Sequence, residues 1–250
     1  MSEKILGVLG GIGPLATVYF MDMLVKMTDA DCDQGHIPVL CYNHSTIPDR
    51  TEYILDNAKP NPLPVMENDA LLLEKAGVSH IAIPCNTAHY FYEQLQKKVN
   101  VPIINIIEET VNYITAHNAN VRKIGILATE GTIAARAYQN VCAAHGVDYA
   151  TPNDFDKKSL MNIIYHQVKA GKPADFEEFM RIIGVMKHEG CDAVILGCTE
   201  LSIIHRDFNM NRPDVVDSLE VLARRCIELC GKKPISPRAN TELRADTTLR

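Results

Sequence analysis

The sequence predicts an α/β fold of two similar domains, related by duplication, whose helix-covered parallel sheets face each other across a cleft. Two observations lead to this prediction. Short runs rich in valine and isoleucine alternate with longer amphipathic stretches, which is typical of repeated strand–helix units. The second half of the chain also repeats the first, because GVSHIAIPCNTAH at 77–89 resembles GCDAVILGCTEL at 190–201, and ILGVLGGIG at 5–13 resembles KIGILATEG at 123–131.

The spacing of the two repeated patterns supports a duplication. The offset is 118 residues from Gly7 to Gly125 and 113 residues from Cys85 to Cys198. Each copy therefore carries one cysteine at the same place in its pattern. If the two halves face each other, one thiol lies on each side of the cleft.

The first domain is predicted to span residues 1–117. Its apolar runs do not alternate with polar residues, which indicates strands buried on both faces. The predicted strands are Ile5–Leu9, Val39–Tyr42, His80–Pro84 and Ile103–Ile107. The predicted helices are Pro14–Met27, Pro64–Lys75, Thr87–Lys97 and Glu108–His117. The stretch Arg50–Pro64, with Pro48 just before it, contains four prolines and is predicted to be a loop.

The second domain is predicted to span residues 118–213 and to repeat the alternation. Strands are expected at Lys123–Ala128, Val147–Thr151 and Ala193–Leu196, and helices at about Ile133–His145, Lys157–Lys169 and Asp175–Glu189. Residues from about 214 to 230 should return to the first domain, with Ser218–Leu229 as a helix. The polar residues 231–250 are predicted to form a tail outside the fold.

Composition excludes several classes of protein. The net charge of −6 and the absence of a basic stripe argue against nucleic-acid binding. No apolar run approaches the length of a membrane-spanning helix, and the N-terminus does not resemble a signal peptide, so a cytoplasmic protein is expected. The eight cysteines include no C-x-x-C pair, which argues against a zinc site and a thiol-redox protein. Cys85 and His89 could form half a metal site, but no second half follows.

The two repeated cysteines are the strongest candidates for chemistry. Cys85 and Cys198 each follow a predicted strand and precede a predicted helix. Ligands of parallel sheets bind beyond the carboxyl ends of the strands, and a helix N-terminus favours the thiolate form of a cysteine. Two cysteines in equivalent places indicate a function more strongly than either alone.

Three further features have both a structural and a functional interpretation. The loop from Gly11 to Gly13 is a weak match to a dinucleotide fingerprint and fits a backbone cradle for a carboxylate better. Arg50 is either a solvated loop arginine or a bidentate partner for a carboxylate. Lys169 is either a lysine near a helix C-terminus or a pyridoxal-phosphate lysine, although no phosphate-binding loop accompanies it.

Six motifs together resemble the aspartate/glutamate racemase family, and most closely its cofactor-independent aspartate racemases. They are GGIGPLAT, IPDRT, PCNTAH, LATEGT, VKAG and LGCTEL, in that order between residues 5 and 230. The resemblance implies two similar α/β domains with the active site between them, a small amino-acid substrate, a homodimer, and chemistry without cofactor or metal. It also implies that Cys85 and Cys198 are the acid–base pair.

The resemblance assigns roles to other residues as well. It implies that Asn86, Thr87 and Thr129 hold the α-carboxylate and the amino group, with Gly11, Thr132 and Thr199 nearby. It implies that Arg50 and Lys169 meet the side-chain carboxylate of aspartate.

One departure favours aspartate as the substrate. Glutamate racemases usually carry an acidic residue in the N-terminal glycine loop and a histidine after GCT, where this chain has GGIGP and Glu200. Glutamate or broad amino-acid specificity remains the alternative within the family. From other classes, a two-lobed small-ligand binding protein and a thiol-redox protein are kept as alternatives.

Overall fold

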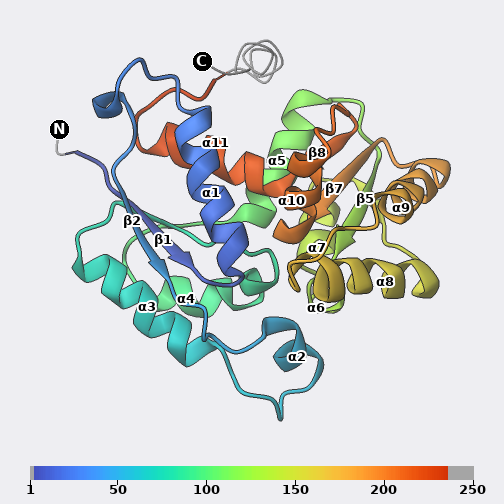
Figure 1. Cartoon of the computed structure of the whole chain (residues 1–250), viewed down its shortest axis with the longest axis horizontal. Coiled ribbons are helices and arrows are strands. Elements are labelled where there is room, and N and C mark those ends of the chain that lie inside the picture. The colour runs from blue at the N-terminus through green and yellow to red at the C-terminus, as the bar shows by residue number, and fades with distance from the viewer. Residues whose placement is uncertain (1–2, 236–250) are drawn as a thin grey trace.

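The computed structural model describes residues 3–235 and contains two four-stranded parallel sheets, one in each half of the chain (Figure 1). The first sheet has the order β2-β1-β3-β4 and the second the order β6-β5-β7-β8, so the two halves share one topology. The strands are β1 Leu6–Gly10, β2 Val39–Asn43, β3 His80–Ala82, β4 Ile103–Ile104, β5 Lys123–Ala128, β6 Asp148–Ala150, β7 Ala193–Gly197 and β8 Val215–Asp217. The predicted fold class is confirmed.

Helices cover both faces of the first sheet. The helices of this half are α1 Pro14–Met27, the 3₁₀ turn η1 Asp33–Gly35, α2 Arg50–Leu55, α3 Leu63–Lys75, the 3₁₀ helix η2 Thr87–Phe91, α4 Tyr92–Lys98 and α5 Ile106–His117. Helix α2 lies away from the sheet and packs on α6 (Glu130–Ala134) of the second half (Figure 1). Leu6 and Val8 of β1 join the core that contains Phe20 of α1, whereas Leu9 joins the core that contains Met66 of α3. Burial of successive residues of β1 on opposite faces explains why its sequence is apolar without alternation.

The second half follows the same plan and returns to the first. Its helices are α6 Glu130–Ala134, α7 Ala137–Ala144, α8 Asp154–Met161, the π-helical turn η3 Asn162–Val168, α9 Phe176–His188, α10 Thr199–Asp207 and α11 Ser218–Leu229. Helix α11 packs against α1 and α5 of the first half, as expected from the sequence (Figure 1). One continuous core therefore extends through both halves on this side of the molecule.

The predicted loop at Arg50–Pro64 is wrong in its first part, because α2 begins at Arg50. The Asp49 carboxylate accepts a hydrogen bond from the backbone N–H of Glu52 at 3.0 Å, which caps the helix. The prolines that suggested a loop lie outside these six residues. The predicted strand Ile103–Ile107 is also too long, because the Asn105 side chain caps α5 immediately afterwards.

Three further boundaries differ from the prediction in the second half. The expected helix Ile133–His145 is divided at Arg136, whose φ of 54° is left-handed. The expected helix Lys157–Lys169 begins earlier and ends in the π-helical turn. Strand β8 was not predicted, and its pairing with β7 carries the second sheet past residue 213.

The first residues of the predicted tail run along the end of α1. The N–H of Asp29 donates to the Lys233 carbonyl at 2.9 Å, and the N–H of Ile235 donates to the Met27 carbonyl at 2.7 Å. Residues 236–250 lie outside the described part of the chain. Within residues 3–235, no helix is both long and apolar enough to cross a bilayer.

The two halves touch through short elements at the carboxyl ends of their sheets. Helix α2 of the first half packs against α6 of the second. A Cβ atom on Gly131 in α6 would lie only 2.8 Å from the Thr51 Cα, so this close approach requires glycine. The contact brings the motifs IPDRT and LATEGT together.

The glycine loop after β1 gives a test of this fold. Gly11 has a φ of +90°, and a Cβ there would lie 2.2 Å from the His44 carbonyl carbon. Gly77 is the matched control, because its φ is +83° but no described atom lies within 4 Å of its Cβ position. Gly77→Ala should cost about 1–2 kcal/mol of unfolding free energy for the backbone alone. Gly11→Ala should cost clearly more in urea unfolding, and equal costs would contradict the packing described here.

Candidate active site

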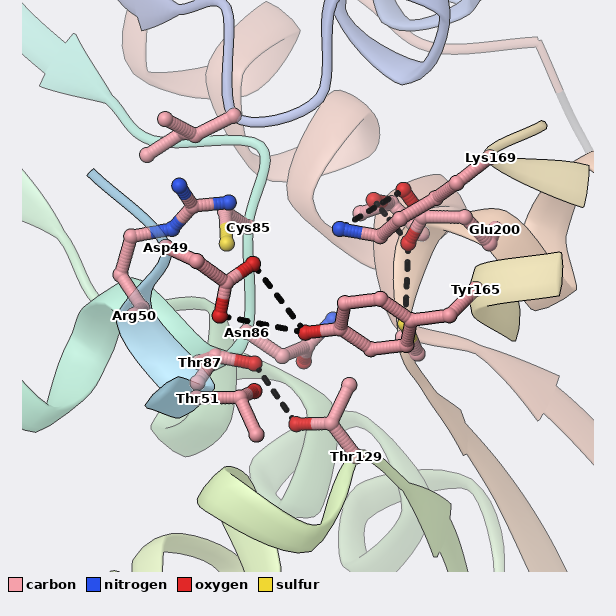
Figure 2. A pocket seen from close by; sticks show the side chains of 13 residues that line it. Asp49, Arg50, Thr51, Cys85, Asn86, Thr87, Thr129, Tyr165, Lys169 and Glu200 are labelled. Carbon is pink, nitrogen blue, oxygen red and sulfur yellow. Dashed lines mark hydrogen bonds and ion pairs between the residues drawn. The ribbon is translucent and has the colours of Figure 1, made fainter. Parts of the chain in front are cut away.

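A small cavity of about 10 Å³ lies where the carboxyl ends of the two sheets meet (Figure 2). The predicted site residues that line it are Arg50, Cys85, Asn86, Thr87, Thr129, Lys169, Cys198 and Thr199. The lining also includes Ile12, Asp49, Thr51, Tyr165 and Glu200, which are not among the predicted substrate-binding or catalytic residues. The cavity therefore collects side chains from motifs in both halves.

Cys198 follows β7 directly and is the N-cap residue of α10. Its Sγ donates a hydrogen bond to Glu200 Oε2 at 2.9 Å. Burial raises the pKa of the Cys198 thiol well above its ordinary value, and the negative charge of Glu200 raises it further. The expectation that the helix N-terminus makes this residue a thiolate is therefore wrong for the ligand-free protein, in which Cys198 is a thiol at neutral pH.

Cys85 lies between β3 and the 3₁₀ helix η2, and its side chain is buried. Its carbonyl accepts a hydrogen bond from His89 Nδ1 at 2.9 Å. Because Nδ1 donates, His89 Nε2 can accept the N–H of Ile106, which lies 3.3 Å away. Burial lowers the pKa of His89, so the ring is neutral and both nitrogens serve the backbone. His89 holds the Cys85 loop in place, and the half metal site considered from the sequence is not formed.

Lys169 lies beside the second cysteine. Its Nζ is 3.6 Å from Glu200 Oε1 and 4.7 Å from the centre of the Tyr165 ring. Burial alone would lower the pKa of Lys169, but Glu200, Tyr165 and Cys198 together outweigh burial and the pKa is raised. A lysine that forms imines needs a lowered pKa instead. The environment of Lys169 is therefore that of a fixed positive charge.

Arg50 is a charged residue of the cavity with a buried donor that has no partner in the described part of the chain. Its side chain is only 6% exposed, and one terminal nitrogen donates to the Pro48 carbonyl at 2.9 Å. Its Nε has no hydrogen-bond partner among residues 3–235. A buried guanidinium with an unmet donor is costly unless an anion binds there. Arg50 and Lys169 reach the cavity from opposite sides (Figure 2).

Tyr165 and Asp49 join the halves across the cavity. The Tyr165 hydroxyl lies 3.2 and 3.3 Å from the two carboxylate oxygens of Asp49 (Figure 2). Burial raises the pKa of Tyr165, so the hydroxyl keeps its proton and donates it to the carboxylate. This bond leaves Asp49 satisfied and closes one side of the cavity.

Three threonine hydroxyls form a ring between the halves. Thr87 Oγ1 lies 2.9 Å from Thr129 Oγ1 and 2.9 Å from Thr132 Oγ1, and the last two are 3.1 Å apart. Thr87 and Thr129 face the cavity, whereas Thr132 does not line it. Hydroxyls rotate freely, so the ring can turn donors toward a bound carboxylate.

Asn86 is held more firmly than the sequence suggested. Its Oδ1 accepts a hydrogen bond from the Tyr138 hydroxyl at 2.5 Å, and its Nδ2 donates to Ser218 Oγ at 3.1 Å. Its amide is therefore mainly engaged with other protein groups, and only one N–H remains to meet a ligand.

Gly11 does not belong to the cavity. It lines an adjoining recess of about 310 Å³, which shares Asp49, Arg50, Lys169 and Glu200 with the cavity. Its N–H donates to Thr17 Oγ1 at 2.9 Å, so it is not available to cradle a carboxylate. The prediction for Gly11 is wrong in that respect.

The residues that sequence reasoning missed had local signals. Glu200 lies two positions after Cys198, and Tyr165 lies four positions before Lys169, on the same helical face. Asp49 belongs to the IPDRT motif that also contains Arg50. Only the fold shows that these three side chains meet.

Comparison with known proteins identifies the family. Residues 9–226 match the model of the Asp/Glu/hydantoin racemases. The chain belongs to this family. Two of its relatives match this chain over most of its length. The aspartate racemase of Picrophilus torridus is 30% identical, with a TM-score of 0.78 over 93% of this chain and 96% of that one. The broad specificity amino-acid racemase RacX of Bacillus subtilis is 28% identical over 89% of this chain and 96% of its own.

Glutamate racemases are also similar to this chain. The glutamate racemase of Limosilactobacillus reuteri is 26% identical over 94% of this chain and 84% of its own. The structure of the Francisella tularensis glutamate racemase shares the fold, with a TM-score of 0.64 over 92% of this chain and 81% of that one at 19% identity. The relatives thus differ in their named substrates.

The environment of Cys198 in this racemase-family chain can be tested by titration. The difference in ultraviolet thiolate absorbance between the parent and Cys198→Ser isolates this thiol. We expect its midpoint to lie above the ordinary cysteine value of about 8.5. The same difference measured in the Glu200→Gln background should show a lower midpoint, because a neighbouring negative charge is removed. A parent midpoint at or below about 8.5 would contradict the assignment.

Proposed function

We propose that this chain is an isomerase that interconverts L- and D-aspartate without a cofactor, with Cys85 and Cys198 as its two acid–base groups. The observation that carries the proposal is that both thiols line one buried cavity. They follow β3 and β7, which occupy the same position in two sheets of like order. A carbon held between them could lose a proton from one face and gain one on the other.

The first steps follow from the protonation of Cys198. Because Cys198 is a thiol, it can supply a proton to the α-carbon. The proposed reaction then requires Cys85 to lose its own proton before it removes the α-proton from the opposite face. After one turnover Cys85 is the thiol and Cys198 the thiolate. That state is the one required by the opposite enantiomer, so the roles exchange with the direction of the reaction.

The carbanion formed between these steps needs stabilisation. Charge moves from the α-carbon into the α-carboxylate, and donors placed around that carboxylate stabilise it most in a water-poor cavity. We assign this role to the Thr87 and Thr129 hydroxyls and to Thr199 at the N-terminus of α10. Asn86 adds its one remaining N–H.

Arg50 supports aspartate over amino acids with one carboxylate. Its unpartnered Nε is a donor that a second carboxylate could engage, and Lys169 adds positive charge across the cavity. Asp49 and Glu200 already have hydrogen-bond partners within the protein. The aspartate racemase of Picrophilus torridus, at 30% identity, is consistent with this proposal.

Broad amino-acid specificity is the second candidate. It is favoured by the recess beside the cavity, which would give room for longer side chains, and by the similarity to RacX. A homodimer and a cytoplasmic location remain predictions.

Replacing either cysteine tests the two-thiol proposal. Cys85→Ser and Cys198→Ser should each lower aspartate racemisation by roughly 10²–10⁴-fold, because serine is a far weaker acid. Racemisation is measured by chiral chromatography with aspartate, glutamate, alanine and asparagine as substrates. The protein is first dialysed against a chelator, and no pyridoxal phosphate is added. The exposed Cys32 provides the control, since Cys32→Ser should retain full activity. Near-parental racemisation by either cavity mutant would overturn the mechanism.

Arg50→Ala tests the choice of substrate. It should weaken kcat/KM for aspartate by an amount on the order of 2–5 kcal/mol, and Arg50→Lys should rescue only part of this loss because lysine lacks the planar fork. Activity on alanine should fall far less. The melting temperature should change little, because removal of the unpartnered Nε offsets the loss of the hydrogen bond to the Pro48 carbonyl. Parental kcat/KM of Arg50→Ala for aspartate would refute the assignment.

A further inference from the structure

Tyr138 connects the two cysteine loops, although it lines neither the cavity nor the recess. Its side chain is fully buried, and its hydroxyl donates to Asn86 Oδ1 at 2.5 Å. Asn86 directly follows Cys85 in the chain. The hydroxyl of a residue in α7 of the second half thus holds the loop of the first cysteine.

The ring of Tyr138 holds the other loop. A Cβ on Gly197 would lie 2.9 Å from Tyr138 Cε2, so the ring rests directly on the backbone of that glycine. Gly197 immediately precedes Cys198. This contact explains the glycine in LGCTEL, because a larger residue would push the ring and the cysteine loop apart.

A second path closes the same connection. Asn86 Nδ2 donates to Ser218 Oγ at 3.1 Å, and Ser218 Oγ donates to the Leu196 carbonyl at 2.7 Å. Leu196 lies two positions before Cys198. The four residues linked by these hydrogen bonds are all at most 1% exposed: Tyr138, Asn86, Ser218 and Leu196. Both Tyr138 and Ser218 therefore tie the loop of Cys85 to the end of β7.

We propose that Tyr138 is a positioning residue that sets the distance between the Cys85 and Cys198 thiols. The inference rests on the proposed two-thiol racemisation. That reaction requires both thiols within reach of one carbon from opposite faces, and a misplacement of about 1 Å can cost on the order of 10²-fold. A reaction that needs a single base does not depend on this spacing.

The test therefore compares racemisation with a one-base reaction in Tyr138→Phe. The one-base reaction is loss of chloride from 3-chloroaspartate. One cysteine thiolate takes the α-proton, the carbon–chlorine bond breaks with its electron pair going to chloride, and a double bond forms between the α- and β-carbons. The resulting enamine tautomerises to an imine, which water hydrolyses to the 2-oxo acid and ammonia. The threo diastereomer of the analogue is used, and each of its two enantiomers is assayed for chloride release.

Tyr138→Phe should lower kcat for aspartate racemisation by about 10-fold to 10²-fold with little change in KM. Chloride release should fall less than about 3-fold for at least one enantiomer of the analogue, because one base suffices there. The matched control is Tyr149→Phe, which removes a partly exposed hydroxyl in the same half and should change neither rate. Equal loss of both reactions, or no loss of racemisation, would overturn the proposal.

If Tyr138→Phe does not fold, Ser218→Ala is tested in its place. It removes the hydrogen bonds to Asn86 and Leu196 and should show the same preferential loss of racemisation. The control for this variant is Ser202→Ala, which removes a buried hydrogen bond to Asp217 that does not link the two cysteine loops. It should show no preferential loss of racemisation. A parent protein that racemises no amino acid refutes the proposed function itself. A parent that racemises, with variants that show no preferential loss, refutes only the role of Tyr138.

Discussion

The carboxyl ends of two like sheets are held against each other by buried hydrogen bonds, and the cavity depends on this contact. Thr87 of the first half bonds to Thr129 of the second, and Asn86 bonds to Tyr138. Each of these polar groups is buried, so each would lose the hydrogen bond that it makes across the contact if the halves separated without admitting water. The closed arrangement is therefore specified by hydrogen bonding, while the apolar core shared through α11 holds the far side together.

The charges in the cavity are arranged around this contact. Glu200 is held between the Cys198 thiol and the Lys169 ammonium, and Asp49 accepts the hydroxyl of Tyr165. These pairings leave the Arg50 Nε without a partner in the described chain. A second carboxylate on the ligand could accept a hydrogen bond from this Nε. A cationic ligand would instead meet Asp49 and Glu200, whose carboxylates already have hydrogen-bond partners. The same Glu200 raises the pKa of Cys198 and so favours its thiol form.

The sequence predicted the fold class, the duplication and eight of the residues that line the cavity, because strand periodicity and repeated motifs are local signals. It failed where a local signal was outweighed. Prolines suggested a loop, although the pair Asp49 and Glu52 carried the capping pattern of α2. The thiol state of Cys198 depends on burial that no motif reveals, and the hydroxyl of Tyr138 meets Asn86 from a helix 52 positions away. Such contacts become visible only once the two halves are packed together.

The central claim is that two separate groups move the α-proton, and isotope incorporation tests it most directly. L-aspartate is incubated briefly with the protein in deuterium oxide. The two enantiomers are then separated, and the deuterium content of each is measured by mass spectrometry. The two-thiol account predicts that the first D-aspartate carries deuterium at the α-carbon while the remaining L-aspartate keeps its original hydrogen. Early deuterium in both enantiomers alike, D-aspartate that retains the original hydrogen, or no D-aspartate at all would contradict it.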